Sequence, residues 1–140
     1  MSFCSNKIKV LFTGHDFKFL THFIEDCREN PKYDVRLDEH RGHEIASEQT
    51  SREYIKWDDI IFCEWALGNA AWYSQNKRPG QLLVVRLHSQ EIQSRLKYLW
   101  ETEWSKVDHL VLICPLTYDW MTKEFPAIKQ RAGIIYNPID

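Results

Sequence analysis

Short apolar runs alternate along this chain with segments whose apolar residues recur every three or four positions. The runs predict buried strands, and the three-to-four-residue spacing predicts helices that pack one face against a sheet. Strands are expected at residues 8–13, 33–37, 60–63, 82–87, 109–114 and 133–136. Helices are expected at residues 17–27, 70–75, 91–104 and 115–125, together with a surface helix in the polar stretch 38–57 that ends near Tyr54 or Ile55.

Strands that alternate with helices are typical of βαβ units. We therefore expect a Rossmann-like three-layer α/β/α sandwich with a mostly parallel sheet of about six strands. The 140 residues fit a single domain, residues 1–140, and the contents of 44% hydrophobic and 27% charged residues are those of a folded globular protein. Asp16 is expected to cap the first helix.

Charge and cysteine usage narrow the classes of partner. The 18 basic and 20 acidic residues give a net charge of −2, which provides no field for binding nucleic acid. The four cysteines form no C-x-x-C pair, and we interpret them as buried thiols of a reducing compartment, which predicts a cytoplasmic protein. No apolar run approaches the length of a membrane span.

Several kinds of site are not expected. His40 and His43 are spaced as H-x-x-H without a cysteine or carboxylate at ligand spacing, so we predict no metal site. The chain has no G-x-G-x-x-G, no Walker A loop and no nucleophile elbow, which argues against a nucleotide-using enzyme complete in this one domain. No tightly bound cofactor is predicted.

Polar side chains gather after the predicted strands. Parallel sheets bind ligands outside the carboxyl ends of their strands. The loops at that edge carry four of the six histidines together with acidic and amide residues: His15, His40, His43, His88, Glu64, Gln90 and Glu91. The opposite edge carries mainly lysines and turn residues. The sequence therefore predicts a binding site at the carboxyl edge.

Four segments, in order along the whole chain, resemble the N-terminal half of family-4-type glycosyltransferases with the two-domain GT-B architecture. The first is residues 7–12, which lead into Thr13 and Gly14. The second is a strand that ends in His88 and is followed by Gln90 and Glu91. The third and fourth are residues 107–114, an aspartate followed by a strand, and residues 133–140, a strand followed by Asn-Pro-Ile-Asp.

This resemblance implies that the chain is the acceptor-side half of a sugar-nucleotide-dependent transferase. The donor-binding half would begin after Asp140, and the partner of this half would be a sugar or glycan acceptor. The resemblance also implies a retaining mechanism, in which the leaving nucleotide phosphate helps to deprotonate the acceptor, and little activity for this chain alone. It departs from the family in having one glycine, Gly14, where two are common, and Cys114-Pro115 in place of a serine.

The resemblance gives His88 a catalytic role, namely hydrogen bonding to the donor sugar or to the charge that develops between sugar and phosphate. The alternative is a histidine that caps the following helix. Each other candidate for substrate binding also has a structural alternative. Gly14 could bind a phosphate and His15 an acceptor, or both could simply form a tight turn. Glu64 could bind a sugar hydroxyl, or it could be a solvated carboxylate. Trp65 could stack on a sugar, or it could be a core residue. Gln90 and Glu91 suit acceptor hydroxyls or the dipole of a helix.

Two further alternatives stay open. The chain could be a stand-alone flavodoxin-like ligand-binding or regulatory module, although such a module should end in a helix and not in a strand. The amphipathic, aromatic stretch 95–100 could touch a membrane that carries a lipid-linked acceptor. The commoner role of such a stretch is to pack against the sheet.

Overall fold

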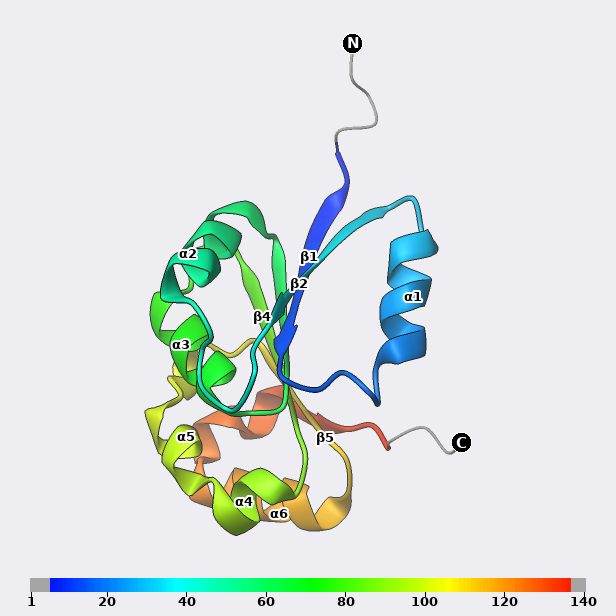
Figure 1. Ribbon diagram of the computed structural model, residues 1–140. Helices are drawn as coiled ribbons and strands as arrows, with labels where there is room; N and C mark the ends of the chain where they lie inside the picture. Colours follow the sequence, from blue (N-terminus) through cyan, green and yellow to red (C-terminus); the bar gives the residue numbers. More distant parts are fainter. Residues whose placement is uncertain (1–5, 137–140) are drawn as a thin grey trace.

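The computed structural model describes residues 6–136 and contains a six-stranded sheet (Figure 1). All neighbouring strands are parallel, in the order β2-β1-β3-β4-β5-β6. The strands are β1 (Ile8–Gly14), β2 (Tyr33–Glu39), β3 (Ile60–Glu64), β4 (Leu82–Leu87), β5 (His109–Leu112) and β6 (Ala132–Ile134). The expected parallel α/β sandwich of about six strands is confirmed.

The helices form two unequal layers. They are α1 (Thr21–Glu29), α2 (Glu48–Trp57), α3 (Gly68–Asn76), α4 (Gln90–Ser94), α5 (Leu96–Glu101), α6 (Pro115–Glu124) and the 3-10 turns η2 (Trp104–Lys106) and η3 (Pro126–Arg131). Only α1 covers its face of the sheet, whereas α2 to α6 lie on the opposite face (Figure 1). Right-handed crossovers explain this division, because the step from β1 to β2 crosses the sheet in one direction and every later step crosses it in the other.

Each face of the sheet has its own apolar core. The larger core joins the sheet to α2–α6 through fully buried residues such as Leu11, Ile61, Val85 and Leu110. The smaller core lies under α1. Its buried members are Val10, Phe12, Leu20 and Ile24. Because central parallel strands are buried on both faces, they appear in the sequence as continuous apolar runs.

Several expected elements differ from the structure. The helix expected at residues 91–104 is broken at Arg95, whose φ of −134° and ψ of 38° are not helical, so it forms α4, α5 and η2. The first helix begins only at Thr21. Asp16 does not cap it but accepts a hydrogen bond from the backbone N–H of Lys18 at 3.0 Å, within a local turn. The strands β5 and β6 are shorter than expected.

The cysteine thiols differ in burial, whereas all of them were expected to be buried. Among residues 6–136, Cys63 is buried, but Cys27 and Cys114 are only half-buried, and all three are free. Cys4 and the Asn-Pro-Ile-Asp tail lie outside the described residues. No helix in the described part is long and apolar enough to cross a membrane. In α5, Leu99 packs in the core while Trp100 stays 63% exposed and contacts Phe125.

Candidate functional site

The site lies where the strand order reverses. From β1 the chain crosses to β2 on one side and later returns to β3 on the other, so the connections that leave β1 and β3 run to opposite faces of the sheet. Such a reversal opens the crevice in which parallel α/β domains bind ligands. Gly14 ends β1, Glu64 ends β3, and His88 follows β4 directly. The structure therefore places Gly14, Glu64 and His88 together at this edge.

Glu64 is the centre of a buried charge network. Its side chain is fully buried, and Glu64 is paired in register with Arg86 on the neighbouring strand. The guanidinium of Arg86 donates to one carboxylate oxygen of Glu64 at 2.6 Å. The other oxygen lies 3.1 Å from Nε2 of His88. A buried carboxylate needs such partners, since an uncompensated charge in the interior is strongly destabilising.

His88 is held by aromatic rings as well as by this carboxylate. Its ring stacks on Trp65 with centroids 3.8 Å apart, and Phe19 lies 5.3 Å away. Because Glu64 accepts at Nε2, that nitrogen carries a proton, and Nδ1 has no hydrogen-bond partner within residues 6–136. His88 is only 4% exposed. The rings of Phe19 and Trp65 thus cover much of the His88 side chain.

The backbone at Trp65 is strained. Its φ of 70° lies in the left-handed region, which a bulky residue rarely adopts. The indole N–H donates to the carbonyl of Asp16 at 3.1 Å, which ties the loop after β3 to the loop after β1. Strain of this kind persists where the surrounding structure fixes it, and it is common at binding sites.

Glu91 links the segments that follow β3 and β4 through hydrogen bonds. One of its carboxylate oxygens accepts from the backbone N–H groups of His88 and Ala66, at 3.0 and 2.9 Å. The other oxygen is buried and has no partner among residues 6–136. Burial raises the pKa of this carboxyl, and the two backbone hydrogen bonds oppose the rise. Gln90, in contrast, is exposed at the start of α4 and does not join the cluster.

Gly14 allows two strands to approach closely. A Cβ at this position would lie 2.8 Å from the carbonyl oxygen of Glu64 and 3.4 Å from the ring of Phe17. The glycine is therefore required by the packing of β1 against β3, a role that no pattern in the sequence indicated.

His40 belongs to a buried polar cluster beside the site. Its Nδ1 accepts from the backbone N–H of Ala46 at 3.0 Å, so the proton is on Nε2, which lies 2.8 Å from the hydroxyl of Thr13. Burial lowers the pKa of His40, and neighbouring Asp38 partly opposes this shift. Asp38 in turn accepts from Ser51 and Tyr73, each at 2.6 Å. Within residues 6–136 no group of three or more potential ligands could hold a metal ion.

Two residues of the network were missed from the sequence. Asn69 donates to the carbonyls of Thr13 and Glu64, at 2.8 and 3.0 Å, and so joins the ends of β1 and β3. Arg86 neutralises Glu64. The signal for Arg86 was present, because it is the one charged residue inside the apolar run 82–87. No pattern in the sequence marked Asn69.

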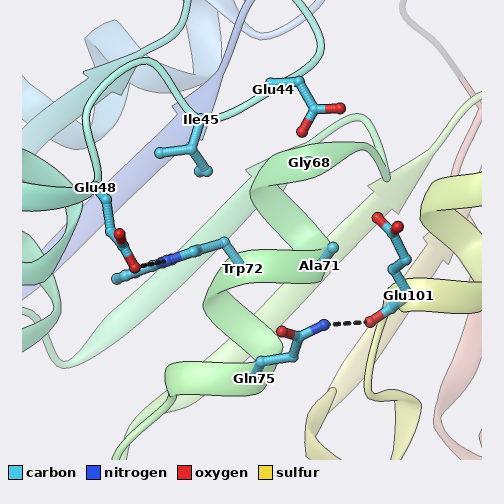
Figure 2. Close-up of a pocket in the computed structure, with 8 residues that line it drawn as sticks. All are labelled: Glu44, Ile45, Glu48, Gly68, Ala71, Trp72, Gln75 and Glu101. Atoms are coloured by element: carbon cyan, nitrogen blue, oxygen red, sulfur yellow. Dashed lines mark hydrogen bonds between the residues drawn. The ribbon is translucent and has the colours of Figure 1, made fainter.

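A separate groove of about 510 Å³ lies over the helical layer between α2, α3 and α5 (Figure 2). Trp72 donates to Glu48, and Gln75 donates to the backbone of Glu101 (Figure 2). Eight residues line the groove: Glu44, Ile45, Glu48, Gly68, Ala71, Trp72, Gln75 and Glu101. It contains none of the predicted site residues, and its charged side chains are all acidic.

The cluster at the carboxyl edge thus combines an imidazole, an ion pair and aromatic rings. An imidazole can donate or accept a proton near neutral pH, and the carboxylate of Glu64 fixes the orientation of this ring. Aromatic faces suit the apolar faces of a ligand. Comparison of the chain with protein-family models, curated proteins and solved structures finds no match in any of the three.

Proposed function

We propose that this chain is the acceptor-side half of a sugar-nucleotide-dependent glycosyltransferase built from two Rossmann-like domains. The observation that carries the proposal is the cluster of His88, Glu64 and Trp65 at the reversal of strand order. It lies at the edge where a second domain would close over a ligand. The resemblance of the sequence to the GT-B family supports the same assignment.

In this proposal His88 is the catalytic residue. Glu64 holds its Nε2, and in the charged imidazole Nδ1 also bears a proton. This N–H donates to the donor sugar or to the negative charge that develops as the phosphate leaves. Glu64 is a positioning residue, since both of its oxygens are already engaged. Catalysis then relies on placement and on stabilisation of charge.

The surrounding residues bind the acceptor. Movement of Phe19 would expose the ring of His88, which Trp65 supports by stacking, to an acceptor sugar. His15 and the exposed Gln90 are further contacts for the acceptor. The donor nucleotide is held by the second domain. We also propose a cytoplasmic location, because nucleotide-sugar chemistry and the three free thiols suit a reducing compartment.

One observation favours a second candidate. The order β2-β1-β3-β4-β5 is that of flavodoxin-like domains, many of which function without a partner domain. A stand-alone ligand-binding or regulatory module would use the same edge of the sheet. In such a module His88 and Glu64 would shape the pocket, and no group would be transferred.

The coding sequence beyond Asp140 separates the two candidates. The glycosyltransferase proposal expects a second Rossmann-like domain with a basic residue and two glutamates eight positions apart. The whole protein should then release nucleoside diphosphate from a nucleotide sugar. His88→Ala should lower kcat by about 10²- to 10³-fold, the usual effect of losing one donor to a developing charge. His22→Ala, on the exposed side of α1, is the control. A gene that stops at Asp140 would refute the proposal.

A further inference from the structure

Three nitrogen-bearing side chains meet at the carboxyl edge. They come from separate segments: His15 follows β1, His43 lies between β2 and α2, and Arg95 separates α4 from α5. The rings of His15 and His43 are nearly perpendicular, with centroids 5.1 Å apart. Nε of Arg95 donates to Nδ1 of His43 at 3.0 Å. This group, called here the His15–His43–Arg95 cluster, is distinct from His88 and Glu64.

The cluster has no anionic partner in the described part of the chain. No carboxylate oxygen of residues 6–136 lies within 4.0 Å of the ring nitrogens of His15 or His43 or of the guanidinium of Arg95. The nearby carboxylates already have cationic partners: Asp16 pairs with Lys18, Glu44 with Lys97, and Glu64 with Arg86. The cluster therefore has no direct ion pair of its own, and Asp16, Glu44 and Glu64 act on its histidines only at longer range.

The fold disfavours the charged form of His15. Burial lowers the pKa of His15, and the neighbouring His43 and His40 lower it further, whereas Asp16 and Glu64 oppose the shift only in part. Its ring nitrogens have no hydrogen-bond partner within residues 6–136. An anion beside the ring would supply the missing partner and would favour the protonated form.

The donors of the cluster match an oxyanion. Because Nδ1 of His43 accepts from Arg95, the proton of this imidazole is on Nε2. Arg95 also donates from Nη1 to the carbonyl of Ser94, and its other guanidinium N–H groups can donate to a ligand. Guanidinium and imidazole N–H groups form strong charge-assisted bonds to phosphate and carboxylate oxygens.

There is room beside the cluster for the rest of a ligand. An open depression of about 500 Å³ is lined by residues 41–46, which include His43 and the exposed Arg41. The exposed Arg41 adds a second cation to this depression. The ring of Trp65 lies 5.7 Å from that of His15 but is itself only 9% exposed and stacks on His88.

We propose that the His15–His43–Arg95 cluster binds the phosphate or carboxylate group of a small hydroxylated ligand. The anion site follows from the geometry and charge of these residues. Its assignment to the acceptor substrate rests on the proposed function, and in that case the acceptor is an anionic sugar such as a sugar phosphate.

NMR of the histidine rings in the 140-residue chain tests the site. Inorganic phosphate, glucose 6-phosphate, glucuronate and glucose serve as probes at pH 6.0 and pH 8.0. The anionic probes should shift the His15 and His43 signals saturably, with at least threefold tighter binding at pH 6.0, and glucose should not; His43 is the reporter in variants at His15. Arg95→Gln and His15→Gln should each weaken the binding about tenfold. Arg52→Gln, which removes an arginine paired with Glu48 on α2, should leave it unchanged.

Binding that is absent, or that responds equally to Arg52→Gln and Arg95→Gln, overturns the anion site. Amide spectra of each variant show that it is folded. The transfer assay on the whole protein is independent of this measurement. Transfer to a neutral acceptor with no phosphate binding would keep the glycosyltransferase proposal and refute the anion site. Phosphate binding by a protein without transfer activity would do the reverse.

Discussion

At the scale of single residues, Asp58 carries a buried carboxyl whose charge the fold opposes. It caps the end of α2, and its Oδ1 accepts from Gln81 at 2.6 Å, while its Oδ2 is buried without a partner among residues 6–136. Burial raises the pKa of this group to about 7, and Arg78 opposes the rise in part. The folded protein therefore holds a proton on Asp58 that the unfolded chain releases near pH 4.

This gives a prediction of defined sign. Since the folded-state pKa is the higher one, Asp58 stabilises the protein below about pH 4, and this contribution is lost as the pH rises through about 7. The amide of Asp58→Asn does not titrate. The variant should therefore become more stable relative to the natural protein between pH 4 and 7, by a few kcal/mol at most, since one pKa unit is about 1.4 kcal/mol.

Urea unfolding of the two proteins at pH 4, 5.5, 7 and 8 measures this difference. Asp119→Asn on the exposed side of α6 is the matched control and should show no trend with pH. A constant difference between Asp58→Asn and the natural protein would contradict the argument.

At the scale of elements, two glycines set how closely segments of the site approach. A Cβ at Gly68, the first residue of α3, would lie 2.5 Å from the carbonyl oxygen of His43 and 2.9 Å from Cα of Glu44. A Cβ at Gly14 would lie 2.8 Å from the carbonyl oxygen of Glu64. The obstructing atoms are backbone, so whole segments would have to shift.

Gly68→Ala and Gly14→Ala should each cost about 1–3 kcal/mol of stability, the usual effect of overpacking. Gly133→Ala is the control, because nothing lies within 4 Å of a Cβ at that position. Midpoints of chemical unfolding give the comparison. Equal midpoints for all three variants would show that the 40–46 loop and the end of β3 yield more easily than their contacts suggest.

At the scale of the whole molecule, stability should be graded across the sheet. The strands β1, β3, β4 and β5 each pair with two neighbours, whereas β2 and the three-residue β6 pair with one. The central strands also contribute the fully buried residues of the larger core. On the opposite face of the sheet, α1 is the one helix in the described part of the chain. Local opening should therefore begin at the edges, where the fewest contacts are lost.

Amide hydrogen exchange tests this gradient. Backbone amides of β1, β3 and β4 should exchange most slowly, through global unfolding, and those of β6 fastest among the strands. The measurement requires only the 140-residue chain at neutral pH, with peptides resolved by mass spectrometry. Protection of β6 equal to that of β3 would refute the expected order.

Much of this architecture was contained in the sequence. The apolar runs at 8–13, 60–63 and 82–87 were sufficient to predict β1, β3 and β4, because strands buried on both faces must be apolar throughout. The gathering of histidines at one edge also follows from the sequence, since in a parallel sheet all carboxyl ends meet on the same side.

The tertiary structure decided the remaining features, because they depend on contacts between segments that are distant in the sequence. Nothing local in the sequence predicts the break at Arg95, because the spacing of the apolar residues is helical on both sides of it. Glu64 and Arg86 form their ion pair because the register of β3 against β4 sets them side by side. The burial of His88 depends on Trp65 and Phe19, which approach it from two other loops. Local patterning thus determines which elements form, and only their packing determines which charges are paired and which side chains a ligand can reach.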